Sequence, residues 1–364
     1  MTDRRSYWAW GMESQEPTPA KREAAAKAMS ERFGASLDTV QARSVEQLDL
    51  RPSRITAPDT LSEIVTADTY ERAFHTYGHS FRDRIRKFSG DFQNPPDLVA
   101  YPRNEADVVS LLDWCGGAGY AAIPFGGGSS VVGGVESPEG YDGVVTLDMT
   151  RMDRVLEVDD ISRAVRVQGG TLGPLLEAQL KPHGFTMRHF PQSFEYSTVG
   201  GWIVTRGGGH YATNHTHIDE FVESVRMVTP AGPWESRRLP GSGAGPSPDR
   251  LALGSEGILG VVTEAWMRIQ GRPRFRASTG VSFPSLESVS DAARAIAQAK
   301  LWPANLRVLD PGEGQAMAGL DGKTAILIIG FESAEVPQDA FIHEAVAIAR
   351  DYGGQVDDDE IVIS

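Results

Sequence analysis

The segment GGGSSVVGG, at residues 126–134, follows directly on the apolar run AAIPF at residues 121–125. The apolar run predicts a short β-strand, so the glycines lie where a strand ends. Residues without side chains let a ligand approach the backbone closely, and they let neighbouring N–H groups converge on an anion. We therefore expect a phosphate or pyrophosphate group to bind at this loop.

Two common nucleotide-binding loops are excluded by the residues that follow. A Rossmann loop leads directly into a helix and has an acidic residue about 20 positions later. Asp148 stands at a suitable distance, but the segment VVGGVESPEG at residues 131–140 has too many helix breakers to form that helix. The Lys-Ser or Lys-Thr pair of a nucleoside-triphosphate loop is also absent from this segment.

Two further segments combine glycines with hydroxyl side chains. The first is PQSFEYSTVGGW at residues 191–202, which leads to TRGGG at residues 205–209. The second is GSEGILGVV at residues 254–262, which enters an apolar strand. Each alone is typical of a surface loop, whereas three such segments in this order indicate one shared ligand site.

The surrounding sequence predicts a mixture of strands and helices. Expected strands lie at residues 98–101, 143–148, 154–159 and 164–168, and expected helices begin at Asn104 and run over residues 172–180. After Arg272 the order is strand 275–283, helix 285–300, strands 305–309 and 324–331, and helix 338–350. This β-α-β-β-α order is that of a ferredoxin-like unit, whose last strand would fall within residues 355–364.

Composition limits the class of protein. The chain has 364 residues, which suggests two domains or three. A net charge of -14 argues against binding to nucleic acid or to an anionic membrane surface. Cys115 is the single cysteine, so no internal disulfide can form. We therefore expect a cytoplasmic protein. We also expect the Cys115 side chain to be buried. No apolar run approaches the roughly 18 residues of a transmembrane segment.

The three glycine segments, taken in order, resemble the FAD-binding domain of the vanillyl-alcohol oxidase type, and within it the alkyldihydroxyacetonephosphate synthase (alkylglycerone-phosphate synthase) family. WAWG at residues 8–11 and RPSR at residues 51–54 are similar to the N-terminal region of that family. The resemblance implies an α+β fold in three parts. These are an N-terminal helical arm (1–94), a FAD-binding domain of two α+β subdomains (95–272), and a partial ferredoxin-like α+β cap (273–364).

The resemblance also implies FAD as the cofactor. The first segment would hold the pyrophosphate, the second would lie along the flavin and ribityl chain, and the third would close on the adenine side. Ser129 stands where some relatives attach FAD through a histidine or cysteine, so noncovalent FAD is expected. The implied cofactor-binding residues are Pro124, Phe125, Gly126, Gly127, Gly128, Ser129, Ser130, Gln192, Ser193, Phe194, Glu195, Tyr196, Ser197, Thr198, Thr205, Arg206, Gly207, Gly208, Glu256, Gly257, Ile258, Leu259, Gly260, Val261 and Val262.

The implied reaction is the exchange of the acyl group of acyl-dihydroxyacetone phosphate for a long-chain alcohol, a step of ether lipid synthesis without net redox change. Arg307 matches the arginine that the family places near the flavin and the substrate, and it is the expected catalytic residue. From the sequence alone, a salt bridge between Arg307 and Asp310 is an equally good interpretation. The family's catalytic tyrosine and histidines lie beyond the position of Ser364, so we expect a C-terminally truncated chain. RRLPGSGAGP at residues 237–246 departs from the family pattern and leaves substrate choice open.

Two other functions remain open at this point. One is a FAD-dependent dehydrogenase or oxidase of a 2-hydroxy acid such as lactate or glycolate, and the other is a non-catalytic FAD-binding fragment. His210, His215 and His217 have the composition of a metal site, but the neighbouring glycines fit a flavin-side loop better, so no metal is expected. The expected substrate is a small or lipid-like molecule, no nucleic acid partner is expected, and a homodimer is left open.

Overall fold

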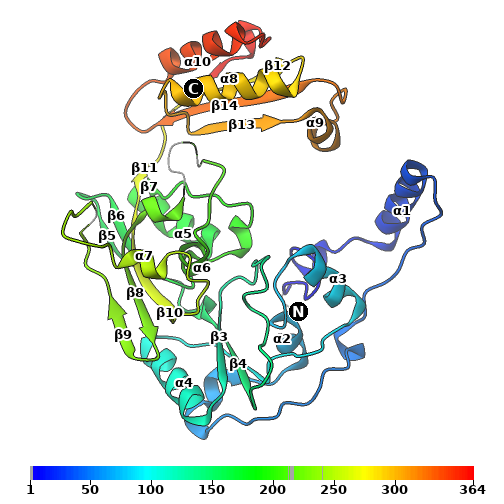
Figure 1. Ribbon diagram of the computed structural model, residues 1–364, viewed down its shortest axis with the longest axis vertical. Helices are drawn as coiled ribbons and strands as arrows, with labels where there is room; N and C mark the ends of the chain where they lie inside the picture. Colours follow the sequence, from blue (N-terminus) through cyan, green and yellow to red (C-terminus); the bar gives the residue numbers. More distant parts are fainter. Residues whose placement is uncertain (1–2, 212, 214–216, 240) are drawn as a thin grey trace.

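The structure, a computed structural model, describes residues 3–211, 213, 217–239 and 241–364. Within these residues the chain forms four sheets with helices packed on them (Figure 1). The predicted α+β fold is confirmed. In the part of the chain that is described, no helix is both long enough and apolar enough to cross a bilayer.

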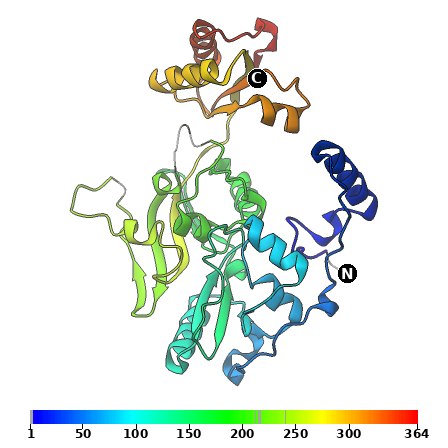
Figure 2. The ribbon, with the colours of Figure 1, turned by 45° about the vertical axis from the view of Figure 1, so that its right-hand side comes forward.

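The regular structure of the N-terminal part, residues 3–94, is mainly helical. Helix α1 (Pro19–Phe33) is capped by Thr18, buries no residue and projects away from the body in both views (Figures 1 and 2). Helices α2 (Thr69–Phe74) and α3 (Phe81–Ser89) lie closer to the body. Aromatic residues of this region, including Phe74, pack in one cluster with Phe125, the residue that precedes the first glycine segment. The arm is therefore joined to that segment through a shared core.

The first sheet has the strand order β1-β2-β4-β3, and β2, β4 and β3 run parallel. The strands are β1 (Val65–Thr66), β2 (Leu98–Ala100), β3 (Ala121–Phe125) and β4 (Val144–Asp148). Asn104 is the N-cap of helix α4 (Glu105–Ala118), as predicted, and its side chain accepts a hydrogen bond from the Asp107 N–H. Cys115 is buried on this helix, and burial raises the pKa of its thiol to about 12, so it packs as a small apolar side chain.

A buried carboxylate ties the RPSR segment to this sheet. Asp97 precedes β2 and is fully buried. It accepts hydrogen bonds from Arg51 at 2.5 Å, from Arg54 at 2.7 Å and from the Val144 N–H at 2.9 Å. These donors favour the ionised carboxyl and hold the pKa of Asp97 below its ordinary value, despite the opposing effect of burial.

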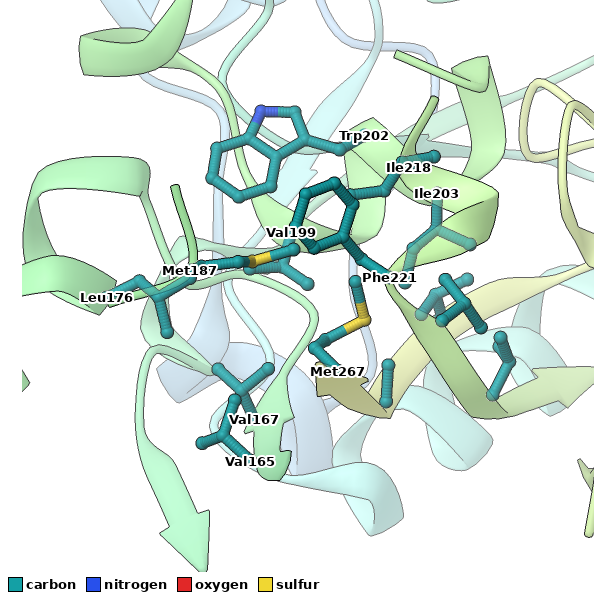
Figure 3. Close-up of a cluster of buried hydrophobic side chains, with 14 of the residues drawn as sticks. Val165, Val167, Leu176, Met187, Val199, Trp202, Ile203, Ile218, Phe221 and Met267 are labelled. Carbon is teal, nitrogen blue, oxygen red and sulfur yellow. The ribbon is translucent and has the colours of Figure 1, made fainter. Parts of the chain in front are cut away.

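The second sheet is antiparallel and has the order β5-β6-β10-β8-β9. Its strands are β5 (Val155–Asp159), β6 (Ala164–Gln168), β8 (Val222–Thr229), β9 (Gly232–Glu235) and β10 (Val261–Arg268). The helices beside it are α5 (Gly173–Leu180), α6 (Val199–Thr205) and α7 (Asp249–Ala252). Figure 3 shows Trp202 and Ile203 of α6 in the apolar core that also contains Val167 of β6 and Met267 of β10. Burial of this helix face fixes α6 on the sheet.

The C-terminal sheet has the order β13-β14-β12-β15. Its strands are β12 (Phe275–Phe283), β13 (Asn305–Leu309), β14 (Ala325–Ser333) and β15 (Val362–Ile363). Helices α8 (Leu286–Gln298) and α10 (Asp339–Asp351) share a buried core with this sheet. The predicted β-α-β-β-α-β order is confirmed, with a short added helix α9 (Pro311–Ala318) between β13 and β14.

A strand pair and two ion pairs connect the C-terminal sheet to the domain that contains the second sheet. Strands β7 (Phe185–Thr186) and β11 (Gln270–Gly271) pair at the point where the chain leaves that domain. Arg188 forms an ion pair with Glu332, and Arg163 forms one with Glu335 at 2.5 Å. The C-terminal unit therefore has side-chain contacts to the body in addition to the covalent link.

Candidate functional site

A cavity of about 330 Å³ lies where the first and second sheets meet. The loop after β3, the end of β6, helix α6 and the start of β10 all contribute to its wall. The three glycine segments, separated in the sequence, therefore meet at one place. This convergence is the arrangement that their order in the sequence indicated.

Most of the predicted cofactor-binding residues line this cavity. They are Pro124, Phe125, Gly126, Gly127, Gly128, Ser129, Ser130, Ser193, Ser197, Thr198, Thr205, Gly207, Glu256, Gly257, Gly260, Val261 and Val262. The predicted residues of the first segment, Pro124 to Ser130, all line the wall. Only some of the predicted residues of the second and third segments do so.

The other predicted residues are not among those that line the cavity: Gln192, Phe194, Glu195, Tyr196, Arg206, Gly208, Ile258 and Leu259. Phe194 stacks behind the wall on Trp202, with ring centroids 6.2 Å apart. Arg206 pairs with Asp219 at 2.9 Å. Ile258 is 83% exposed to solvent. In these segments, some residues form the wall, some pack or pair behind it, and Ile258 faces solvent.

Several wall residues were not in the predicted set: Val131, Val132, Gly134, Val135, Met149, Gly169, Pro191, Gly200, Gly201, Trp202 and Val204. Those at 131–135 simply continue the first segment, and Gly200, Gly201 and Trp202 belong to the second. Gly169 follows β6 and was marked in the sequence only by the pair Gly169-Gly170. Met149 carries no sequence signal, because an apolar residue after a strand is typical of any core.

Close backbone packing explains why the first segment consists of glycines. A Cβ atom on Gly126 would lie 2.3 Å from the Thr198 hydroxyl, and one on Gly127 would lie 1.7 Å from the Tyr196 carbonyl oxygen. Gly128 has φ 68°, in the left-handed region that disfavours other residues. The first and second segments therefore touch backbone to backbone, and side chains on these glycines would separate them.

Unpaired donors line this part of the wall. Among the described residues, the backbone N–H groups of Gly127, Gly128, Ser129 and Ser130 donate no hydrogen bond to the protein. The Ser130 hydroxyl is also buried without a partner. Gly127 and Gly128 are buried residues, and N–H groups of buried residues rarely lack acceptors in folded proteins. Several N–H groups without acceptors in one glycine-rich loop make a cradle that fits the phosphate oxygens of a dinucleotide.

The wall residues carry little charge. Among the described residues that line the wall, Glu256 is the one ionisable side chain. Burial raises the pKa of its carboxyl above the ordinary value, because the charged form loses hydration there. The described wall residues include no lysine or arginine, so an anionic ligand would be held by backbone N–H groups and hydroxyls. The remaining surface is largely glycine and valine, together with Trp202, which suits a flat aromatic ring system.

A buried histidine lies behind the wall. His189 is 3% exposed, its Nε2 has no hydrogen-bond partner, and its ring packs edge-on against Trp202 at 5.0 Å. Burial lowers the pKa of His189 to about 4, so the ring is neutral near pH 7. His189 therefore supports the tryptophan that forms the wall.

Arg307 lies on β13, and the residues that line the cavity do not include it. Its guanidinium donates to Glu313 at 2.9 Å. The alternative expectation of a bridge to Asp310 was wrong, because Asp310 instead caps α9 by accepting from the Glu313 N–H. The catalytic role of Arg307 stays a prediction.

The histidine-rich segment is only partly described. His215 lies outside the described residues. Within those that are described, no group of three or more histidine, cysteine or carboxylate side chains could hold a metal ion. Asp219, which follows this segment, pairs with Arg206 and Arg250.

Comparisons with known proteins agree with this geometry. Residues 96–236 match the family described as FAD binding domain, and residues 272–360 match the C-terminal domain of FAD linked oxidases. An alkyldihydroxyacetonephosphate synthase of Dictyostelium discoideum is 38% identical over 258 residues, which cover 71% of this chain and 42% of that protein. A mitochondrial D-lactate dehydrogenase (cytochrome) of Arabidopsis thaliana is 30% identical over 268 residues, 72% of this chain and 45% of that one.

A solved structure of an alkyldihydroxyacetonephosphate synthase superposes with a TM-score of 0.81 at 31% identity, covering 90% of this chain and 67% of that one. The chain spans less than half the length of the curated relatives named above. The resemblance seen in the three glycine segments is confirmed. The chain belongs to the alkyldihydroxyacetonephosphate synthase family of FAD-binding proteins.

Proposed function

We propose that this chain binds FAD noncovalently in the cavity between its first two sheets and serves the exchange of an acyl group of acyl-dihydroxyacetone phosphate for a long-chain alcohol. The observation that carries the proposal is the convergence of three glycine segments on one cavity, where the N–H groups of Gly127 to Ser130 find no acceptor among the described residues. The activity would make the protein a transferase of ether lipid synthesis, and its cytoplasmic location belongs to the same proposal.

The chain's own residues would bind and shield the cofactor. The N–H groups of Gly127 to Ser130 and the Ser130 hydroxyl would hold the pyrophosphate. Trp202 and the valines of the wall would exclude water from the ring system. Ser129 has a hydroxyl where a covalent attachment would need an imidazole or a thiol, so the complex would be noncovalent. FAD, when bound, supplies an electrophilic isoalloxazine ring that no side chain can replace.

Arg307 would provide a cation for the phosphate group of the substrate. Its guanidinium is paired with Glu313 at 2.9 Å, and both side chains are partly exposed. An exposed pair of this kind contributes about 1 kcal/mol or less, so a doubly charged phosphate can compete for the arginine. Substituting Arg307 by Met would therefore weaken substrate binding and leave FAD binding unchanged.

The likeness to D-lactate dehydrogenase supports a second candidate, oxidation of a 2-hydroxy acid. Two assays on the purified FAD-loaded protein separate the candidates. Transfer of a labelled long-chain alcohol onto acyl-dihydroxyacetone phosphate, without reduction of an electron-accepting dye, supports the first. Dye reduction by lactate or glycolate supports the second. Bound FAD with neither activity would identify a non-catalytic FAD-binding chain.

A further inference from the structure

We infer that Arg5 and His79 are positioning residues that turn the first glycine segment into an anion cradle, by holding its carbonyl groups on the side away from the cofactor. The inference deepens the proposed function and rests on it. It concerns two residues far from the segment in sequence, neither of which lines the cavity.

Three carbonyl groups of the segment are held by these two residues. The Arg5 Nη1 donates to the Gly127 carbonyl oxygen at 2.5 Å. The His79 Nδ1 lies 3.0 Å from the Gly128 carbonyl oxygen, and the His79 backbone N–H donates to the Ser130 carbonyl oxygen at 2.7 Å. Each of these peptide groups therefore has its oxygen fixed in one direction.

Peptide geometry then sets the direction of the N–H groups. In a trans peptide the carbonyl oxygen and the N–H of the next residue point to opposite sides, and no peptide bond of the described residues is cis. The carbonyls of Gly127 and Gly128 belong to the same peptides as the N–H groups of Gly128 and Ser129. Those two N–H groups have no protein acceptor, and their residues line the cavity. Holding the carbonyl oxygens on the side away from the cavity therefore directs the two N–H groups toward the cavity.

The Arg5 side chain is fixed on several sides. Its guanidinium carbon lies 4.9 Å from the ring centre of Phe74 and 4.6 Å from that of Tyr196. The Tyr70 hydroxyl donates to the Arg5 carbonyl at 2.7 Å. Within the described residues, no carboxylate forms an ion pair with Arg5, and its Nε is buried without a partner. An unneutralised cation beside the segment also favours an anion bound there.

His79 is fixed equally well. It is buried, and the Trp10 ring packs edge-on against it at 5.2 Å. Gly78 allows the close approach, because a Cβ there would lie 2.2 Å from the Ser130 carbonyl oxygen. Burial, together with the nearby Lys87 and Arg5 cations, holds the imidazole neutral, so it carries a single N–H. We assign that proton to Nδ1, since Gly128 is closer than the Ala9 carbonyl at 3.3 Å from Nε2.

Four single variants test the inference. Arg5→Met removes the donor but keeps an unbranched chain between the two rings, and Arg4→Met is the matched control. Arg4 loses the same charge, but it pairs with the exposed Glu13 and lies over Tyr70. His79→Leu removes the ring donor, whereas His79→Asn restores an N–H donor at the position of Nδ1. The apo-proteins are titrated with FAD, and with riboflavin, which has the ring system without phosphate.

We expect Arg5→Met and His79→Leu to weaken FAD binding about ten- to a hundredfold, as for the loss of a hydrogen bond that orients charge. Riboflavin binding and the apo-protein's melting temperature should stay close to those of Arg4→Met. His79→Asn should recover most of the loss. If His79→Leu does not fold, Arg5→Met and His79→Asn still decide the question.

Two results would overturn the inference while leaving the proposed function intact. One is FAD binding by Arg5→Met equal to that of Arg4→Met. The other is an equal loss for FAD and riboflavin, which would mean that Arg5 only supports the fold. Failure of the wild-type protein itself to bind FAD is a different outcome, because it would overturn the proposed function and this inference together.

Discussion

Arg188 donates to both carboxylate oxygens of Glu332, linking the segment after β7 to strand β14 of the C-terminal sheet. Both side chains are mostly buried, at 16% and 9% exposure. Arg188 also has φ 60°, which an arginine adopts only when its surroundings require it. The pair is therefore a specific joint between the FAD-binding domain and the C-terminal unit.

Breaking this joint should cost stability. Glu332→Gln would leave a buried guanidinium without its counter-ion, and we expect a loss of about 3 kcal/mol in the free energy of unfolding. The exposed pair of Arg163 and Glu335 is the control, and Glu335→Gln should cost about 1 kcal/mol or less. Urea unfolding measures both variants. Equal effects would show that the Arg188 pair is no stronger than a surface pair.

Asp97 should dominate the acid sensitivity of the N-terminal part. Its pKa is lowered in the folded state, so its stabilising contribution is present above the unfolded value of 3.8 and is lost as pH falls through the lower folded pKa. Asp97→Asn should lower the free energy of unfolding by about 3 kcal/mol at pH 7. It should also make that free energy depend less on pH in the acid range. A variant that melts like the wild type at pH 7 would contradict this account of the RPSR segment.

His79 should make stability depend on pH in a different range. Its pKa is lowered to about 3 from 6.5, mainly by burial and also by Lys87 and Arg5. Below pH 6.5 the histidine binds a proton in the unfolded chain but not in the folded chain. The contribution of neutral His79 to the free energy of unfolding is therefore present above pH 6.5 and is lost as the pH falls toward 3. The limiting slope is about 1.4 kcal/mol per pH unit. Melting curves of His79→Gln should show a shallower slope there, and identical slopes would show that His79 is not held neutral.

The glycine at position 127 should tolerate no side chain. Gly127→Ala would place a methyl group 1.7 Å from the Tyr196 carbonyl oxygen and force the first and second segments apart. We expect FAD binding to weaken by about a hundredfold or more, since the donors of the segment would move. Gly116→Ala is the control, because nothing lies within 4 Å of its Cβ position and it stands in helix α4. Normal FAD affinity in Gly127→Ala would contradict the proposed cradle.

Local patterns predicted much of the fold. Strands β3, β6, β12 and β13 have the predicted bounds, because glycine, proline or other turn residues flank each of these segments. Helix α9 was missed, since PGEGQAMA at residues 311–318 contains two glycines that lower its helix propensity. In this helix, the N-cap bond from Asp310 and the αL cap at Gly319 offset that propensity.

The site was predictable to the extent that its chemistry lies in local motifs. Glycines and hydroxyls in three segments indicated the anion cradle, and the predicted residues Pro124 to Ser130 all line the cavity, whereas Val131, Val132, Gly134 and Val135 were not predicted. Arg5 and His79, which orient the peptide groups of the cradle, could not be predicted in this way. They lie 122 and 49 positions away from the carbonyl groups that they contact. No local pattern distinguishes a positioning arginine from one in a solvated arm. Only the packing of Phe74 and Tyr196 around Arg5 reveals it.

The central claim is that three separated glycine segments form one FAD site, and equilibrium binding of FAD to the purified, folded apo-protein tests it most directly. The account predicts saturable binding with a flavin absorption spectrum perturbed by the protein, and full release of FAD on denaturation because no covalent bond is formed. A folded protein that leaves the FAD spectrum and fluorescence unchanged at saturating cofactor would contradict it.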